Sequence, residues 1–417
     1  MRQNRRALPA PPLSARSFFR DPVEYVRAHG RDAPVVRLAA GPREFVLLRD
    51  PEAIWRVLVT DAGSFRPGKW KRRARRFLGE TLNTLDGEEH RRRRLLLQPS
   101  LDRRRIAGFA PSIASLAERA HSGWEDGDRI DLRSELDQLS LTVAGDVLLS
   151  ADLAPCRAEL AGALSRIMAA VPRLVPPVPG TGRARALARV ERVISALIAE
   201  RRASPGAEDD LIGTLLRSGL PERLVRGEAI AFLLAAVDEP PSALVAAWYL
   251  LARHPLQEER FHAELDAALG DRTPGADDVA GLPYLDAVLR ETLRLFPPAR
   301  HIDRCPVDEV RLAGATVRSG SNVLISPLVT HHEPSLYDRP SEFVPERWLE
   351  SGREERSRGA YLPFGIGAHA CIGEPLARLI MTLTLATIGR RWRLRVDPSA
   401  PAPVPRAPRL VFALERR

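Results

Sequence analysis

Cysteine is scarce in this chain, where only Cys156, Cys305 and Cys371 occur among 417 residues. The three are far apart and odd in number, so a disulfide framework is not expected and a reducing compartment fits. The N-terminus also lacks the apolar core of a signal peptide. We therefore expect a cytoplasmic protein.

Apolar runs long enough to cross a bilayer are missing as well. The longest, Ala229–Val237 and Ala243–Ala252, are each too short to span one, and charged residues lie between them. We expect no membrane insertion. Internal repeats and dividing linkers are absent too, so residues 1–417 are predicted to form a single domain, with residues 1–18 as a flexible N-terminal arm.

Positive charge is abundant, with a net charge of +10 and a pI near 10.3. It gathers at Lys71–Arg76, Arg91–Arg94 and Arg103–Arg105. Such clusters can bind nucleic acid, but the interleaved aromatic residues of a single-strand binder are lacking. We expect no nucleic-acid partner, an acidic protein partner, and solvated surface for most of this charge.

A small sheet followed by many helices is the expected secondary structure. Residues Val35–Leu48 predict two short strands around a turn, and Glu52–Val59 predicts a helix. The segment Ser64–Asp86 has mixed polarity and is predicted to be mostly loop. The pattern from Ala107 to Ser218 is helical, so the fold is predicted to be mainly α with a small β part.

One cysteine stands in a glycine-rich stretch, Phe364–Gly373, and a helix is predicted directly after it because Pro375 suits a first helical turn. Cys371 therefore precedes a helix N-terminus, which favours a thiolate. Gly367 and Gly373 are expected to adopt positive φ and to let the backbone pass close to a flat ligand. The residues alone leave two interpretations open: a metal-ligating thiolate and a buried structural cysteine.

A second unusual segment is the apolar run around Asp238 and Glu239, which predicts a helix through the centre of the protein. Pro240 and Pro241 interrupt it, because each removes an N–H that would bond the carbonyl four residues earlier. The carbonyls of Ala236 and Val237 should therefore lose their donors. We interpret this as a strained, hydrated and functional notch.

The pattern Phe-x-x-Gly-x-x-x-Cys-x-Gly resembles the haem-binding loop of the cytochrome P-450 family. Three further motifs follow the order and spacing of that family, and the similarity runs from about Phe19 to the C-terminus. They lie at His90 and Arg94, at Asp238 and Glu239, and at Glu291 and Arg294 with a later Pro345-Glu346-Arg347. The resemblance implies a cytochrome P-450-like fold with haem between the central long helix and the Cys-loop helix.

The resemblance also implies a site. Cys371 would ligate the iron of haem b, within a loop shaped by Phe364, Gly367 and Gly373. The donors to the haem propionates would be His90, Arg94, Arg304 and His369. The group of Glu291, Arg294 and Arg347 would be buried scaffold that positions the Cys loop.

Asp238 and Glu239 are the expected catalytic residues, since they match the family's acid and the threonine that normally follows it. The threonine hydroxyl is absent here, and we expect one of the two carboxyls to keep a proton near neutrality and serve as proton donor. Candidate substrate contacts are Trp70, Ala235, Arg300 and His301. The apolar segment Val171–Pro179 would form the substrate entrance.

The implied function is a monooxygenase acting on a small lipophilic natural product in a specialised biosynthetic pathway. Electrons would come from a ferredoxin or flavodoxin, with NAD(P)H used only indirectly through a reductase, and the protein would be a monomer. The missing threonine leaves oxidative coupling, desaturation and peroxygenase chemistry as alternatives. A non-catalytic protein that binds haem or small molecules is a third.

Overall fold

The computed structural model describes residues 13–30, 33–40, 43–168, 181–203, 210–349, 357–403 and 410–417. The predicted entrance segment Val171–Pro179 lies outside them. The chain divides into two units. The sheet unit comprises Met1–Arg72, Ala299–Glu342 and Glu354–Cys371; the helical unit comprises Arg73–Pro298, Phe343–Arg353 and Ile372–Arg417.

The sheet unit is built on six strands in the order β1-β2-β3-β9-β6-β4. Their bounds are Leu13–Ser14, Val35–Ala40, Arg43–Leu48, Asn322–Ile325, Ile302–Pro306 and Phe65–Pro67. The predicted strand pair is confirmed, because β2 and β3 form an antiparallel hairpin. A two-stranded ribbon of β7 and β8 (Val310–Leu312, Ala315–Val317) and helix α3 (Pro51–Trp55) belong to the same unit.

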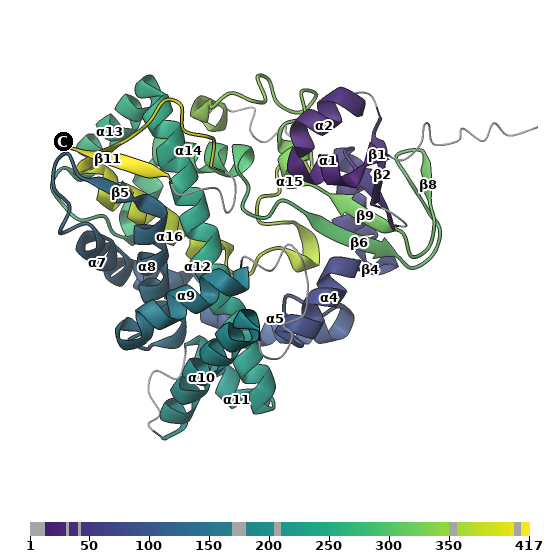
Figure 1. Cartoon of the computed structure of the whole chain (residues 1–417), viewed down its shortest axis with the longest axis horizontal. Helices are drawn as coiled ribbons and strands as arrows, with labels where there is room; N and C mark the ends of the chain where they lie inside the picture. The colour runs from purple at the N-terminus through teal and green to yellow at the C-terminus, as the bar shows by residue number, and fades with distance from the viewer. Residues whose placement is uncertain are drawn as a thin grey trace, which may run out of the picture. The chain divides into compact units, whose positions relative to one another are not determined.

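Successive side chains along a strand point to opposite faces of the sheet, and both faces of this sheet carry buried apolar residues. On one face Val36, Leu38 and Leu47 pack with α1 (Ala15–Arg20) and α2 (Pro22–His29), and α15 (Pro327–His331) lies near them in Figure 1. On the other face Val35 and Leu48 join α3 and the β7–β8 ribbon. The sheet is therefore covered on both sides.

The flexible arm predicted for residues 1–18 is wrong for its described part. Strand β1 pairs in parallel with β2, and Phe18 on α1 is fully buried against Phe19 and Tyr25. Apolar burial thus anchors this segment to the sheet. Residues 1–12 lie outside the described part of the chain.

The helical unit surrounds the long helix α12 (Glu222–Arg253), which packs against α8, α10, α14 and α16 (Figure 1). The helices of this unit include α5 (Gly87–Leu97), α6 (Arg103–Gly108), α7 (Ala110–Ala120), α8 (Leu132–Ala144), α9 (Arg157–Met168), α10 (Gly182–Ala203), α11 (Leu211–Arg217), α13 (Pro255–Leu269), α14 (Pro283–Leu295) and α16 (Glu374–Gly389). A second sheet joins β10 (Trp392–Val396), β11 (Val411–Arg416) and β5 (Arg129–Asp131).

Helix α12 runs through Pro240 and Pro241 without a break, which corrects the predicted interruption. The carbonyl of Ala236 does lose its usual donor, but the Ser140 hydroxyl of α8 donates to it at 3.0 Å. A neighbouring side chain thus replaces the missing backbone hydrogen bond. By length and composition α12 could cross a membrane, yet 61% of its apolar window is buried inside the structure.

The loop predicted for Ser64–Asp86 is also wrong in part, because Lys69–Leu78 forms helix α4. The loop prediction rested on the mixed polarity of the segment and overlooked the helical spacing of its apolar residues Trp70, Ala74, Phe77 and Leu78. Gly68 precedes α4 and donates its N–H to the carbonyl of Asp303 at 3.2 Å. A Cβ at Gly68 would lie 1.9 Å from the Asp303 carboxylate, so this close approach requires glycine.

Candidate functional site

Cys371 is the last residue of the sheet unit and lies in the glycine-rich Cys loop, Phe364–Gly373. The Cys371 N–H donates to the carbonyl of Phe364 at 2.8 Å, which folds the loop back on itself. Cys371 forms no disulfide bond and is exposed, and Gly373 is the N-cap of α16 directly after it. The place of Cys371 directly before the N-terminus of α16 favours a ligating thiolate over a buried structural cysteine.

Two glycines of this loop have positive φ, but they are not the predicted pair. Gly367 has a φ of 75°, as predicted, and the second glycine with positive φ is Gly365, at 69°. Gly373 has a φ of −86°, so its predicted positive φ is wrong. A Cβ on Gly367 would lie 2.2 Å from the carbonyl oxygen of Leu58. Glycine is required there because the loop approaches its own protein backbone.

Two of the predicted propionate donors, Arg304 and His369, belong to the sheet unit. Arg304 is buried on β6, where its Nη1 donates to the carbonyl of Asp303 at 3.0 Å. His369 of the Cys loop has its Nδ1 3.4 Å from the Nζ of Lys71 on α4. Sequence reasoning missed Lys71 as a site residue, because 298 positions separate it from His369 and no pattern links them.

On α5 the predicted pair of His90 and Arg94 lies one helical turn apart, with His90 buried and Arg94 half-buried. The neighbouring Arg93 forms an ion pair with the buried Glu228 of α12. The Glu228 carboxylate also accepts the Leu82 N–H at 2.8 Å. Arg93 is therefore scaffold between two helices. The sequence signal for it is weak, since it is one arginine in a run of four.

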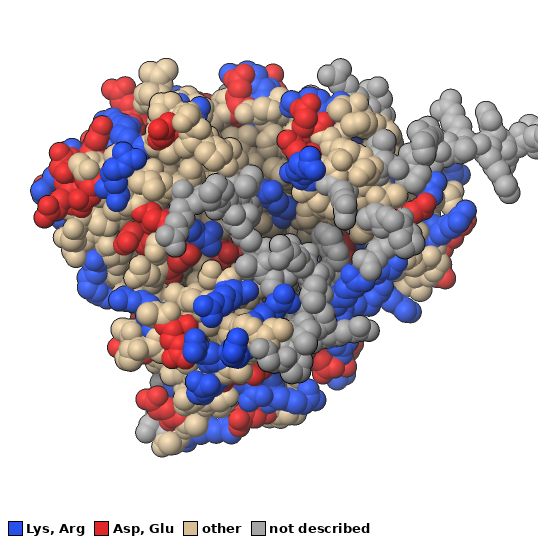
Figure 2. All heavy atoms as spheres, viewed as in Figure 1, with Lys and Arg blue, Asp and Glu red and all other residues tan. Residues whose placement is uncertain are grey.

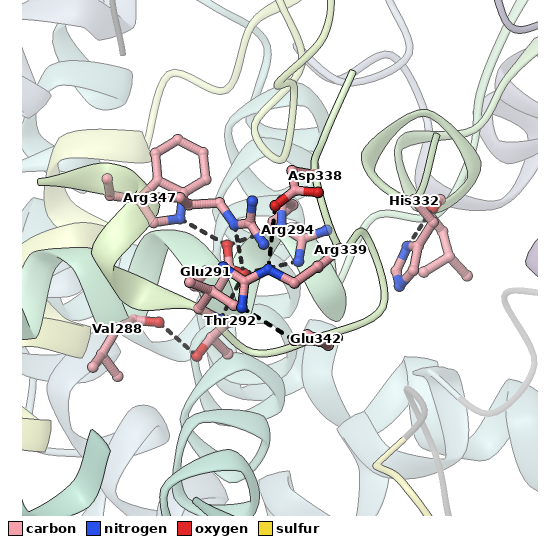
Figure 3. A network of polar contacts seen from close by, with 12 residues as sticks. Val288, Glu291, Thr292, Arg294, His332, Asp338, Arg339, Glu342 and Arg347 are labelled. Atoms are coloured by element: carbon pink, nitrogen blue, oxygen red, sulfur yellow. Dashed lines mark hydrogen bonds and ion pairs between the residues drawn. The ribbon is translucent and has the colours of Figure 1, made fainter. Parts of the chain in front are cut away.

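The predicted scaffold group is present and more extensive than predicted (Figure 3). Glu291 and Arg294 of α14 are fully buried and joined by two hydrogen bonds of 2.8 Å. Arg347 Nε donates to Glu291 at 3.0 Å, Trp348 Nε1 at 2.8 Å and the Val344 N–H at 3.1 Å. Five donated hydrogen bonds thus satisfy one buried carboxylate.

Asp238 belongs to a second polar cluster, at the double proline of α12. Arg133 of α8 donates from Nη2 to Asp238 at 3.0 Å, from Nη1 to the Ser242 hydroxyl at 2.8 Å, and from Nε to Asp137 at 2.6 Å. Burial raises the pKa of Asp137 to about 6, although Arg133 acts against this. One guanidinium therefore serves two carboxyls, and neither Arg133 nor Asp137 was found from the sequence.

The remaining predicted residues occupy different settings. Glu239 is half-buried beside Asp238, and Ala235 is exposed on α12. The side chain of Trp70 lies outside the described part of the structure. His301 packs against Phe19 and Phe18, with ring centroids 5.2 and 6.1 Å apart, and burial lowers its pKa to about 4. This setting favours a packing role for His301.

Basic residues of the surface alternate with acidic ones. Figure 2 shows Lys and Arg mixed with Asp and Glu over the helical unit, where Arg189 pairs with Glu159 and Arg202 with Glu222, both at 2.6 Å. Arg91 and Arg92 likewise share Glu88. These exposed ion pairs support the prediction that most of the basic residues are solvated surface residues.

Comparison with known proteins identifies the family. The cytochrome P-450 family model matches residues 20–416, and the chain belongs to this family. From Streptomyces melanosporofaciens, cyclooctat-9-en-7-ol 5-monooxygenase is 34% identical over 92% of this chain and 87% of its own, and cyclooctatin synthase is 35% identical over 93% and 89%. Pentalenene oxygenase of Streptomyces avermitilis is 29% identical over 92% and 89%.

The fold comparison agrees. The solved structure of retinoic acid bound cyanobacterial CYP120A1 matches with a TM-score of 0.87 and 23% identity, covering 99% of this chain and 100% of that one. The predicted mainly α cytochrome P-450 fold is confirmed, and the protein is an oxidoreductase with haem b as its cofactor. The prediction of an enzyme is thus confirmed over the non-catalytic alternative.

The residues of the structure fit this cofactor. An exposed thiol before a helix N-terminus is the ligand that a haem-thiolate iron requires. Imidazole and guanidinium donors suit the two propionate carboxylates. The chain therefore has the types of side chain that haem needs for its iron and for its propionates.

Proposed function

We propose that this protein is a monooxygenase that inserts one oxygen atom into a lipophilic, terpenoid-like natural product. The observation that carries the proposal is the 34% identity, over 92% of the chain, to cyclooctat-9-en-7-ol 5-monooxygenase. The similarity to pentalenene oxygenase supports the same class of substrate. When bound, haem supplies the oxygen-activating redox chemistry of such a reaction.

We assign Cys371 as the iron ligand, with Phe364, Gly367 and Gly373 shaping the loop that presents it. Its position directly before the N-terminus of α16 supports this assignment. The residues that would donate to the propionates are His90, Arg94, Arg304 and His369, and we add Lys71. The 3.4 Å between Lys71 Nζ and His369 Nδ1 supports this addition, because a nearby carboxylate could accept from both.

Protons would reach the reaction through Asp238 and Glu239. The ion pair with Arg133 holds the Asp238 carboxylate in one orientation, and the Ser242 hydroxyl bonds both that guanidinium and the Asp238 carbonyl. Because Ser140 occupies the Ala236 carbonyl, the proposed water would be held by the carbonyl of Val237 alone. Glu239 would stand in for the hydroxyl residue as proton donor.

The electron donor would be a ferredoxin or a flavodoxin. The net charge of +10 supports an acidic partner of this kind. We further propose that residues 1–417 act as one cytoplasmic, monomeric domain, with NAD(P)H consumed only by the reductase. Trp70 and Ala235 remain proposed substrate contacts.

Oxidative coupling, desaturation or a peroxide-driven reaction is the second candidate. The observation that favours it is Glu239, which stands where the family normally has threonine. A carboxyl at this position could serve a reaction that needs no hydroxyl to orient dioxygen.

Reconstitution distinguishes the two candidates. The holoenzyme is supplied with a ferredoxin, a ferredoxin reductase and NADPH under ¹⁸O-labelled dioxygen, and substrates are first selected by spectral binding among the products of neighbouring genes. We expect a product that carries one labelled oxygen atom. An unlabelled or coupled product, or turnover with peroxide alone, would support the second candidate instead.

A further inference from the structure

Arg300 differs from the other half-buried and buried arginines named above. Its guanidinium makes no hydrogen bond or ion pair with the described residues, and its Nε is excluded from solvent. Arg294 and Arg93, by contrast, each bond a buried carboxylate. A guanidinium that is partly desolvated without a partner costs free energy unless an anion reaches it.

The backbone around Arg300 is held firmly. The Ser326 hydroxyl donates to the carbonyl of Arg300 at 3.0 Å, and β6 begins two residues later, where Ile302 pairs with Ile325 of β9. The next residue, His301, packs against Phe18 and Phe19. The side chain of Arg300 therefore starts from a fixed position in the sheet unit, as a preorganised binding residue should.

The charges near Arg300 do not neutralise it. Burial lowers its pKa, and Asp21 is the acid that acts against this. The Asp21 carboxylate caps α2 by accepting the Glu24 N–H at 3.1 Å and forms no ion pair with Arg300. His301 is neutral at physiological pH, since its pKa is about 4. The local field thus favours an added negative charge.

We propose that Arg300 binds a carboxylate of the substrate, so that this enzyme acts on a lipophilic carboxylic acid. The planar guanidinium offers paired donors that match the two oxygens of a carboxylate. This inference rests on the proposed function and narrows its substrate class. A haem propionate carries the same chemistry, and the experiment separates the two sources.

The probes are abietic, ursolic and palmitic acids and their methyl esters, titrated into the holoenzyme while the haem absorption spectrum is followed. We expect at least one acid to bind wild type about tenfold or more tightly than its ester. Arg300→Gln should lose that preference and keep its affinity for the ester, and Arg300→Lys should retain part of it. The matched control is Arg318→Gln, an exposed arginine of the same unit, which should behave as wild type.

The proposal is overturned if no acid binds wild type better than its ester, or if the preference survives in Arg300→Gln. Haem titration of the apoprotein gives the second arm. If Arg300→Gln weakens haem affinity and leaves the acid preference unchanged, the carboxylate is a propionate and the proposal is wrong. Oxygenation of the esters by wild type would show that the proposed monooxygenase activity stands even then.

Discussion

Two clusters of arginine and carboxylate side chains in the helical unit, one around Glu291 and one around Arg133, differ in how completely their charges are paired. Around Glu291 the carboxylate and Arg294 are fully buried, and two further side chains and one backbone N–H complete the bonding. Around Arg133 one guanidinium faces two carboxyls, and the Asp238 and Asp137 side chains are 16% and 33% exposed. The first cluster is closed and the second is open.

This difference explains the roles that we give to the two clusters. In the closed cluster every strong acceptor position of Glu291 is used, so it can fix geometry but has no capacity to exchange protons. In the open cluster the two carboxyls compete for one cation and remain within reach of water. Groups arranged in this way can gain and lose protons, as a relay requires.

The largest expected effect is loss of the closed cluster. Glu291→Gln leaves the buried Arg294 and the half-buried Arg347 beside a neutral side chain, which should lower the free energy of unfolding by about 3–5 kcal/mol. Chemical denaturation of the holoprotein measures this. The control is Arg290→Ala on the same helix, whose partner Asp286 is partly exposed, with an expected loss below about 1 kcal/mol. Equal losses in both variants would remove the distinction between the clusters.

The open cluster should instead affect chemistry. We expect Asp238→Asn and Glu239→Gln to fold normally and to reduce the rate of product formation about 100-fold, because a positioned proton donor is lost. Product yield per electron consumed is the second measurement, with Glu239→Thr as the variant that restores the hydroxyl. If Glu239→Gln has no effect while Asp238→Asn does, Glu239 is not part of the relay.

Arg133 should act through Asp238 as a positioning residue. Arg133→Gln removes the ion pair and should lower product yield per electron by up to about fivefold, equivalent to about 1 kcal/mol. Arg133→Lys should restore part of the yield and return the pH profile of turnover towards that of wild type. An unchanged yield and pH profile in Arg133→Gln would mean that Asp238 needs no fixed orientation.

The smallest expected effect is the pH dependence from Asp137. Its pKa of about 6 lies above the ordinary value of about 3.9, so the folded protein holds this proton more tightly than the unfolded chain. The contribution of Asp137 to the free energy of unfolding is therefore complete below about pH 4 and is lost as the pH rises from about 4 to 6. After screening by solvent we expect a loss of about 1–2 kcal/mol. Thermal unfolding of Asp137→Asn should lack this slope, and a slope equal to that of wild type would contradict the assignment.

Local patterns predicted much of this structure. The β2–β3 hairpin follows from strand alternation around a turn, and α16 follows from Pro375 and an apolar run after the Cys loop. The resemblance to the cytochrome P-450 family also predicted that Arg347 would join Glu291 and Arg294. These features depend on residues that are near in sequence or carry a recognisable motif.

The errors and omissions have a different origin. The prediction that α12 is interrupted did not allow for Ser140, a residue of another helix. Its hydroxyl donates to the Ala236 carbonyl, which Pro240 cannot do. The contacts of Arg133 with Asp238 and of Lys71 with His369 were missed for the same reason. Long-range side-chain pairs leave no period or spacing in one sequence, so they emerge only when the chain is folded.

The central claim, that Cys371 supplies the thiolate of the site, is tested most directly by the ferrous–carbonyl spectrum of Cys371→Ser. The loop backbone should survive this substitution, because the hydrogen bond from residue 371 to Phe364 uses the backbone N–H. The account predicts that wild type shows the absorption band typical of thiolate-ligated haem and that Cys371→Ser binds haem without that band. Persistence of the band in Cys371→Ser would contradict the account.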